Sequence, residues 1–268
     1  MNFSPDWLRR TCRQITEVRS SAEVMNLGNW SGVRFGRYLL ETEQQLLDKT
    51  CSAMGGYHLM HLGVTAEQCC FKAARQMSRF YIRPPGQALQ FDAGTALADY
   101  NELPLPSAVV DVAILQHALE YASSPQAVLA ETARVMSAGA NLLIFVINPQ
   151  GPMGLARVPV RMLTKRPEYK FYGLQKSRIK DWLALLNFQV LHVANGAYHM
   201  PLERLNNFEG ESLWTRGCEK IHFPWGNFYM IHAVKRVAGG IRKTSPLWKP
   251  AVSNDYRMPS EDARIRHH

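Results

Sequence analysis

The sequence predicts an α/β fold in which a mostly parallel sheet is covered by helices on both faces, the doubly wound arrangement. Residues 109–115 (VVDVAIL) form an apolar run broken only by Asp111, which is typical of a strand buried on both faces. Residues 142–147 (LLIFVI) form a second such run, and apolar residues between the two runs recur at helical spacing. A strand, a helix and a strand in this order predict a right-handed unit with two parallel strands. The chain has 268 residues, of which 46% are hydrophobic, enough for one full core.

The helix of this unit has recognisable start and stop signals. Ser124 is a candidate N-cap, and Pro125 suits the first helical position because its missing N–H would have no partner there. We expect this helix to end near Gly139.

The chain before this unit alternates predicted helices and strands. A glycine-rich connection leads into a helix over residues 38–54, but its glycines follow no strand and so lack the context of a phosphate-binding loop. Strands are predicted at 57–62 and 78–83 with a short helix at 70–77 between them. A third strand is expected within residues 89–98.

The chain after this unit supplies one more helix and two more strands. Ser177 begins a predicted helix that ends at Asn187, a residue type suited to the left-handed position at a helix C-terminus. Strands at 188–193 and 228–234 follow, separated by an irregular polar insert.

We divide the chain into three parts. Residues 1–36 are predicted to be an N-terminal helical extension, and residues 37–238 the main domain. Residues 239–268 lack periodicity and are rich in proline, serine and charge, which predicts a disordered basic tail.

Composition argues against several classes of protein. No apolar run reaches about 18 residues and no signal segment is evident, so we expect no membrane insertion and a cytoplasmic location. The five cysteines are odd in number and include no C-x-x-C pair, which predicts reduced thiols. We also expect no metal site, because His58 and His61 are three residues apart on a strand and would point to opposite faces.

Positive charge is concentrated in one stretch. The net charge is +9, and residues 157–180 contain eight Lys or Arg against one acid, Glu168. Such a patch attracts anionic partners, among which RNA or another nucleic acid is one candidate. A solvated basic face with no dedicated partner is the alternative reading.

Three motifs carry a family resemblance. They are D-x-x-x-LPLP from Asp99, the run VVDVAILQHALEY, and P-Q-x-x-L-x-E-x-x-R-V-x-x-x-G from Pro125. In this order they resemble the type 11 branch of the class I S-adenosylmethionine-dependent methyltransferases, and INPQGPMGL with DWLALLNFQVLH resembles the bacterial YafS-like proteins of that branch. The resemblance implies about seven strands with an antiparallel C-terminal pair, and S-adenosylmethionine as cofactor. Another doubly wound protein with a similar hydrophobic rhythm is the alternative.

The resemblance also implies a cofactor crevice at the carboxyl ends of the early strands. Asp99 stands where the family contacts the adenine amino group, and Glu67 could pair with the ligand's ammonium group. The implied cofactor-binding residues are His61, Gly63, Glu67, Asp99, Tyr100, Leu115 and Gln116.

Two positions depart from the family pattern. His61 stands where the family has an acid in the turn after its first strand, and the glycines that should follow Gly63 are absent. Arg83 stands where an acid accepts hydrogen bonds from the ribose, a function that an arginine cannot perform because it has no acceptor. The cofactor turn is therefore degenerate, and we expect weak cofactor binding.

His117 is the candidate catalytic residue. An imidazole titrates near neutral pH and could accept a proton from a nucleophile that is being methylated. A hydrogen-bonded pocket or core histidine is the alternative.

The sequence therefore predicts a methyltransferase that uses S-adenosylmethionine and acts on an unidentified acceptor, for which the basic stretch suggests an anion. The alternatives are a methyltransferase-like pseudoenzyme and an RNA- or nucleotide-associated binding protein acting through residues 157–180. Neither the acceptor nor the oligomeric state follows from the sequence.

Overall fold

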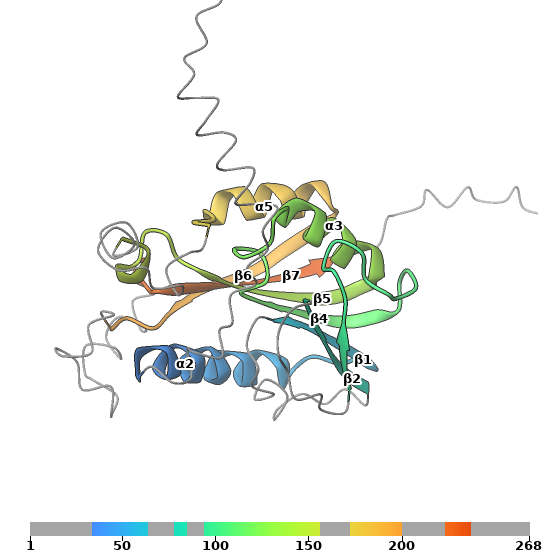
Figure 1. The fold of residues 1–268 in the computed structure, drawn as a ribbon, viewed down its shortest axis with the longest axis horizontal. Helices are drawn as coiled ribbons and strands as arrows, with labels where there is room; N and C mark the ends of the chain where they lie inside the picture. The colour runs from blue at the N-terminus through green and yellow to red at the C-terminus, as the bar shows by residue number, and fades with distance from the viewer. Residues whose placement is uncertain (1–33, 64–77, 85–93, 156–171, 200–222, 237–268) are drawn as a thin grey trace, which may run out of the picture. The chain divides into compact units, whose positions relative to one another are not determined.

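The computed structural model of the chain describes residues 34–63, 78–84, 94–155, 172–199 and 223–236. Within these residues, seven strands form one sheet with the order β3-β2-β1-β4-β5-β7-β6 (Figure 1). The strands are β1 (His58–Gly63), β2 (Ser78–Arg83), β3 (Thr95–Leu97), β4 (Val110–Gln116), β5 (Met136–Ile147), β6 (Phe188–Gly196) and β7 (Phe228–Lys235). The helices are α2 (Arg34–Cys51), α3 (Pro125–Val135) and α5 (Lys176–Leu185).

Strand direction confirms the predicted fold class. β1 pairs in parallel with β2 and β4, and β3 and β5 extend the parallel part of the sheet. β7 runs antiparallel to both β5 and β6, which gives the expected antiparallel C-terminal pair. The strand order reverses between β1 and β4, and in open α/β sheets this is the point where a ligand crevice opens at the carboxyl ends.

Two apolar layers hold the sheet between its helices. α3 and α5 cover one face, whereas α2 covers the other (Figure 1). Along β4, Ala113 and Leu115 belong to the apolar layer that packs against α3 and α5. Val112 and Ile114 belong to the apolar layer that packs against α2. Because β4 is buried on both faces, its sequence is a nearly continuous apolar run.

Some predicted boundaries were wrong by a few residues. α2 begins at Arg34 and ends at Cys51, earlier at both ends than the predicted 38–54. α3 ends at Val135 rather than near Gly139, because Met136 already pairs with Val110 in the sheet and this pairing replaces a further helical turn.

The predicted helix ends have mixed outcomes. Ser124 occupies the N-cap of α3 with Pro125 at the first position, but its hydroxyl makes no capping bond. Asn187 after α5 has φ 61°, which confirms the predicted left-handed position.

Several predicted segments lie outside the described residues. They are the N-terminal extension up to residue 33, the helix at 70–77, much of the polar insert, residues 156–171 of the basic stretch, and the tail from residue 237. Among the helices that are described, we find none long and apolar enough to cross a membrane.

Candidate functional site

The candidate site lies where β1, β2 and β4 end next to one another. Gly63, the last residue of β1, pairs with Gln116, the last residue of β4. Arg83 ends β2 on the other side of β1. Parallel pairing thus brings together three of the positions that the sequence singled out.

His61 fills the space beside Gly63. Its ring is fully buried, and its Nε2 lies 3.1 Å from the side-chain oxygen of Gln116. A Cβ atom placed on Gly63 would lie only 2.4 Å from the Cε1 of His61, so this position accepts only glycine while the ring is there. Burial, and next the positive charge of Arg83, lower the pKa of His61 to about 3. His61 is therefore a neutral imidazole at physiological pH.

Arg83 places a buried positive charge at the end of β2. Its side chain is only 3% exposed, and its guanidinium carbon lies 5.8 Å from the centroid of the Tyr81 ring. Its charge also acts on Tyr100. A buried cation thus occupies the position where the family resemblance implies a ribose acceptor.

Tyr100 ties the ends of β1 and β2 together. Its buried hydroxyl donates to the carbonyl oxygen of Gly63 at 2.8 Å and lies 3.3 Å from that of Ile82. The hydroxyl is therefore engaged with the backbone, and Tyr100 supports the crevice from within the protein.

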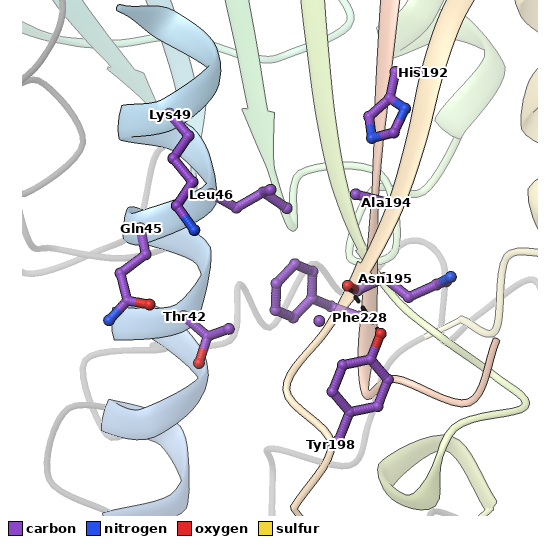
Figure 2. Close-up of a pocket in the computed structure, with 10 residues that line it drawn as sticks. Thr42, Gln45, Leu46, Lys49, His192, Ala194, Asn195, Tyr198 and Phe228 are labelled. Atoms are coloured by element: carbon purple, nitrogen blue, oxygen red, sulfur yellow. Dashed lines mark hydrogen bonds between the residues drawn. The ribbon is translucent and has the colours of Figure 1, made fainter. Parts of the chain in front are cut away.

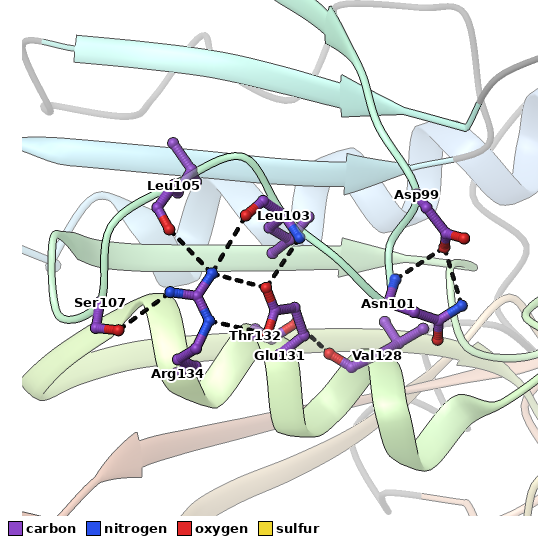
Figure 3. Close-up of polar contacts among 9 residues, drawn as sticks. All are labelled: Asp99, Asn101, Leu103, Leu105, Ser107, Val128, Glu131, Thr132 and Arg134. Atoms are coloured by element: carbon purple, nitrogen blue, oxygen red, sulfur yellow. Dashed lines mark hydrogen bonds and ion pairs between the residues drawn. The ribbon is translucent and has the colours of Figure 1, made fainter.

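Asp99 lies at the rim, two residues after the end of β3 (Figure 3). Its side chain is exposed, and one carboxylate oxygen accepts hydrogen bonds from the backbone and side-chain nitrogens of Asn101, both at 2.9 Å. Within the described part of the chain, the second carboxylate oxygen accepts no hydrogen bond. Asp99 is therefore held in place by one oxygen while the other stays available to a ligand.

The loop that follows Asp99 is fastened to α3 by an ion pair. Nη2 of Arg134 lies 2.7 Å from Oε1 of Glu131 (Figure 3). The same Nη2 donates to the carbonyl oxygens of Leu103 and Leu105 at 3.2 and 2.9 Å. Glu131 accepts from the backbone amide of Leu103 at 2.9 Å, and the hydrogen bond from Arg134 lowers the pKa of Glu131. These residues are the E and R of the motif L-x-E-x-x-R-V, whose structural role the sequence did not reveal.

His117 lies between two carboxylates and is fully buried. Its Nε2 lies 2.8 Å from Oε1 of Glu43, and its Nδ1 lies 2.6 Å from Oε1 of Glu120. Burial alone would lower the pKa of His117, but the two carboxylates outweigh it and raise the pKa to about 10. The ring is therefore an imidazolium whose two N–H groups both donate, so in this arrangement it has no free lone pair for accepting a proton.

Glu43 joins this cluster from α2, and sequence reasoning missed it. It accepts from the side-chain amide of Gln116 at 2.7 Å through its second oxygen. A signal was present, since Leu39, Glu43 and Leu47 recur every four residues and share the buried face of α2. An acid on the apolar stripe of a helix indicates a buried polar partner.

The structure thus brings most of the candidate residues to one region, where some are buried and Asp99 is exposed. His61, Gly63, Tyr100, Gln116 and His117 are buried together, and the side chain of Leu115 packs in the core. Asp99 lies at the exposed rim. Glu67 lies outside the described residues. Contact of any of them with a cofactor stays a prediction.

Comparison with known proteins gives two sequence matches. Residues 65–144 match the family model of the methyltransferase domain. The uncharacterized protein YafS of Escherichia coli K12 is 29% identical over 165 residues, an alignment that covers 62% of this chain and 66% of YafS.

Solved structures share the fold at low sequence identity. A Thermotoga maritima S-adenosylmethionine-dependent methyltransferase, described as a possible histamine N-methyltransferase, has a TM-score of 0.56 at 15% identity and covers 78% of this chain and 93% of its own. A Streptomyces coelicolor geranyl diphosphate C-methyltransferase has a TM-score of 0.51 at 12% identity, with 73% and 78% covered.

The strand order and the antiparallel C-terminal pair are those of the class I methyltransferase fold. The matched domain and the similarity to YafS confirm the resemblance to type 11 methyltransferases and to the YafS-like proteins that the sequence motifs indicated.

Proposed function

We propose that this protein is a methyltransferase that uses S-adenosylmethionine. The observation that carries the proposal is the available carboxylate oxygen of Asp99, which follows the carboxyl end of β3, the edge strand of the parallel part of the sheet. The matched domain supports it, as does the Streptomyces coelicolor neighbour, whose structure contains S-adenosylhomocysteine. The methyl acceptor is not identified.

The described residues fit the adenine end of this cofactor, whereas the positions of His61 and Arg83 depart from the family pattern. Asp99 could accept a hydrogen bond from the adenine amine, while the cofactor would supply an activated methyl group. His61 is packed against Gly63, and buried Arg83 stands at the ribose position. Both changes remove anchoring hydrogen bonds, each worth about 1 kcal/mol. We therefore expect a dissociation constant above roughly 50 µM.

Calorimetry with S-adenosylmethionine and S-adenosylhomocysteine tests the proposal. Asp99→Ala should weaken binding about tenfold, since a hydrogen bond to a charged group contributes about 1.5–3 kcal/mol. Glu102→Ala is the matched control, because Glu102 is an exposed acid on the same loop. Unchanged affinity in folded Asp99→Ala would show that Asp99 does not bind the adenine end of the cofactor. A submicromolar dissociation constant for the native protein would contradict the expectation that the missing hydrogen bonds weaken cofactor binding.

For His117, we propose a positioning role rather than proton abstraction. Acting as a base would require it to break one of two buried ion pairs and lose a proton that both carboxylates stabilise. Through Glu43, His117 instead links α2 to the end of β4, where Gln116 borders the crevice. A positioning role predicts that methyl-transfer activity, once an acceptor is known, shows no titration near the ordinary histidine pKa of 6.5.

The second candidate function is a methyltransferase-like pseudoenzyme. Buried Arg83 and buried His61 favour it, because they replace two of the acidic groups that the family resemblance implies at the cofactor. No heat and no thermal shift at millimolar ligand would support this candidate over the first. The basic stretch as an RNA- or nucleotide-binding surface and the cytoplasmic location stay predictions.

A further inference from the structure

A cavity lies between α2 and the β6–β7 edge of the sheet (Figure 2). Its volume is about 270 Å³. One wall belongs to α2 and the other to β6, the residues after β6 and the start of β7. The lining residues are Thr42, Gln45, Leu46, Lys49, His192, Ala194, Asn195, Gly196, Tyr198 and Phe228.

The polar part of this cavity is suited to an anion. Lys49 and His192 line it, and none of the lining residues is an acid. Both side chains are exposed, and the ammonium group of Lys49 makes no hydrogen bond or ion pair within the described ranges. Its flexible four-carbon stem lets the ammonium group follow a ligand. The cavity therefore has a cation and an imidazole with no carboxylate to neutralise them.

An irregularity in β6 turns His192 into the cavity. The register of β6 against β7 shifts between Val190 and His192. Val190 and Val193 pack on the α5 side of the sheet, whereas Ala194 belongs to the layer beneath α2. The inserted residue reverses the alternation of side chains, as a β-bulge does, so that His192 and Ala194 share the face toward α2.

The rest of the cavity is apolar and small. Leu46 extends from α2 toward the strands, and the amide of Asn195 points away from α2 (Figure 2), where it accepts a hydrogen bond from Lys176. The floor includes Ala194 and the buried ring of Phe228. At about 30 Å³ for each water, the cavity has room for roughly nine waters, or a molecule of about ten non-hydrogen atoms.

We propose that this cavity binds a small organic anion, a carboxylate of about ten non-hydrogen atoms. Its charged end would lie between Lys49 and His192, and its apolar part against Leu46 and Ala194. The lining residues include none of the residues implied for the cofactor, and the proposal does not depend on methyl transfer. Apolar lining with a few placed polar groups is the usual composition of a small-molecule site.

Benzoate and benzamide test this proposal, because they have nearly the same shape and only benzoate is charged. Ligand-observed NMR titration of the full chain should show benzoate binding at least tenfold tighter than benzamide. Lys49→Gln should weaken benzoate binding at least fivefold. Lys180→Gln is the matched control, since it removes one exposed lysine from α5 on the other face of the sheet and should leave binding unchanged.

A second variant tests the apolar part of the cavity. Ala194→Leu reduces the space without changing charge and should also weaken benzoate binding, with circular dichroism confirming its fold. Inorganic phosphate should bind more weakly than benzoate, because it has no apolar part. The proposal is overturned if benzoate fails to bind up to about 20 mM, if benzamide or phosphate binds equally well, or if Lys49→Gln behaves like Lys180→Gln.

Discussion

Replacing His117 tests the buried cluster that links α2 to the crevice. In His117→Gln, the carboxylates of Glu43 and Glu120 stay buried without the cation that lies 2.8 and 2.6 Å from them in the native protein. Removing one partner of a buried ion pair typically costs about 3–5 kcal/mol, because a buried charge is left uncompensated. For a domain of this size each kcal/mol corresponds to about 2–4 °C, so the melting temperature should fall by roughly 10 °C.

Thermal unfolding followed by circular dichroism measures this effect. His192→Gln is the control, because His192 is exposed and its loss should change stability by no more than about 0.5 kcal/mol. Adding Glu43→Gln to His117→Gln removes one of the two opposed carboxylates, so the double variant should be more stable than the sum of the single effects predicts.

The effect of pH has a definite sign. The pKa of His117 is raised from the ordinary 6.5 to about 10 by the two carboxylates, against the opposing effect of burial. The stabilisation is therefore fully present below pH 6.5 and is lost as the pH rises through about 10. The advantage of the native protein over His117→Gln should persist to about pH 9 and shrink above pH 10. A melting temperature unchanged by His117→Gln at pH 7 would refute the assignment of a buried imidazolium.

Three further predictions concern Asp111, Arg134 and the basic stretch. Burial tends to raise the pKa of Asp111, but hydrogen bonds, first from the amide of Tyr57, outweigh it and lower the pKa. Asp111→Ala should therefore cost about 1–2 kcal/mol at neutral pH, as measured by urea unfolding, and the cost should shrink as the pH falls through the lowered pKa. Arg134→Lys should weaken S-adenosylhomocysteine binding several-fold in calorimetry, because lysine cannot hold the two loop carbonyls and Glu131 together; equal affinity would show that the loop needs no such anchor. A triple change to glutamine in the basic stretch should lower any RNA binding and flatten its salt dependence in a filter assay, whereas unchanged binding would leave a solvated basic face. The three positions are Arg161, Lys165 and Arg166.

The sequence alone determined the parts of the fold that depend on neighbouring residues. β2 spans the predicted residues 78–83, and β4 differs from its prediction by one residue at each end. Asn187 takes the left-handed conformation expected of it. These features follow from apolar runs, β-branched residues and local backbone preferences, all of which can be read within a window of about ten residues.

The ends of helices and strands were harder to predict from the sequence, because they depend on which strands pair in the folded chain. Met136 leaves α3 to pair with Val110, which is 26 positions away along the chain, and helical spacing alone carries no trace of that competition. The turn from helix to strand therefore comes earlier than the glycine at 139 suggested.

The tertiary structure decided the chemistry of the site. His117 was predicted as a candidate base from its residue type, but its ring is held by Glu43, which is 74 positions away, and by Glu120. His61 is neutral and Arg83 is buried because the ends of β1 and β2 meet beneath Tyr100. Protonation depends on burial and on charges within a few ångströms, and these are set by residues that only the folded chain brings together.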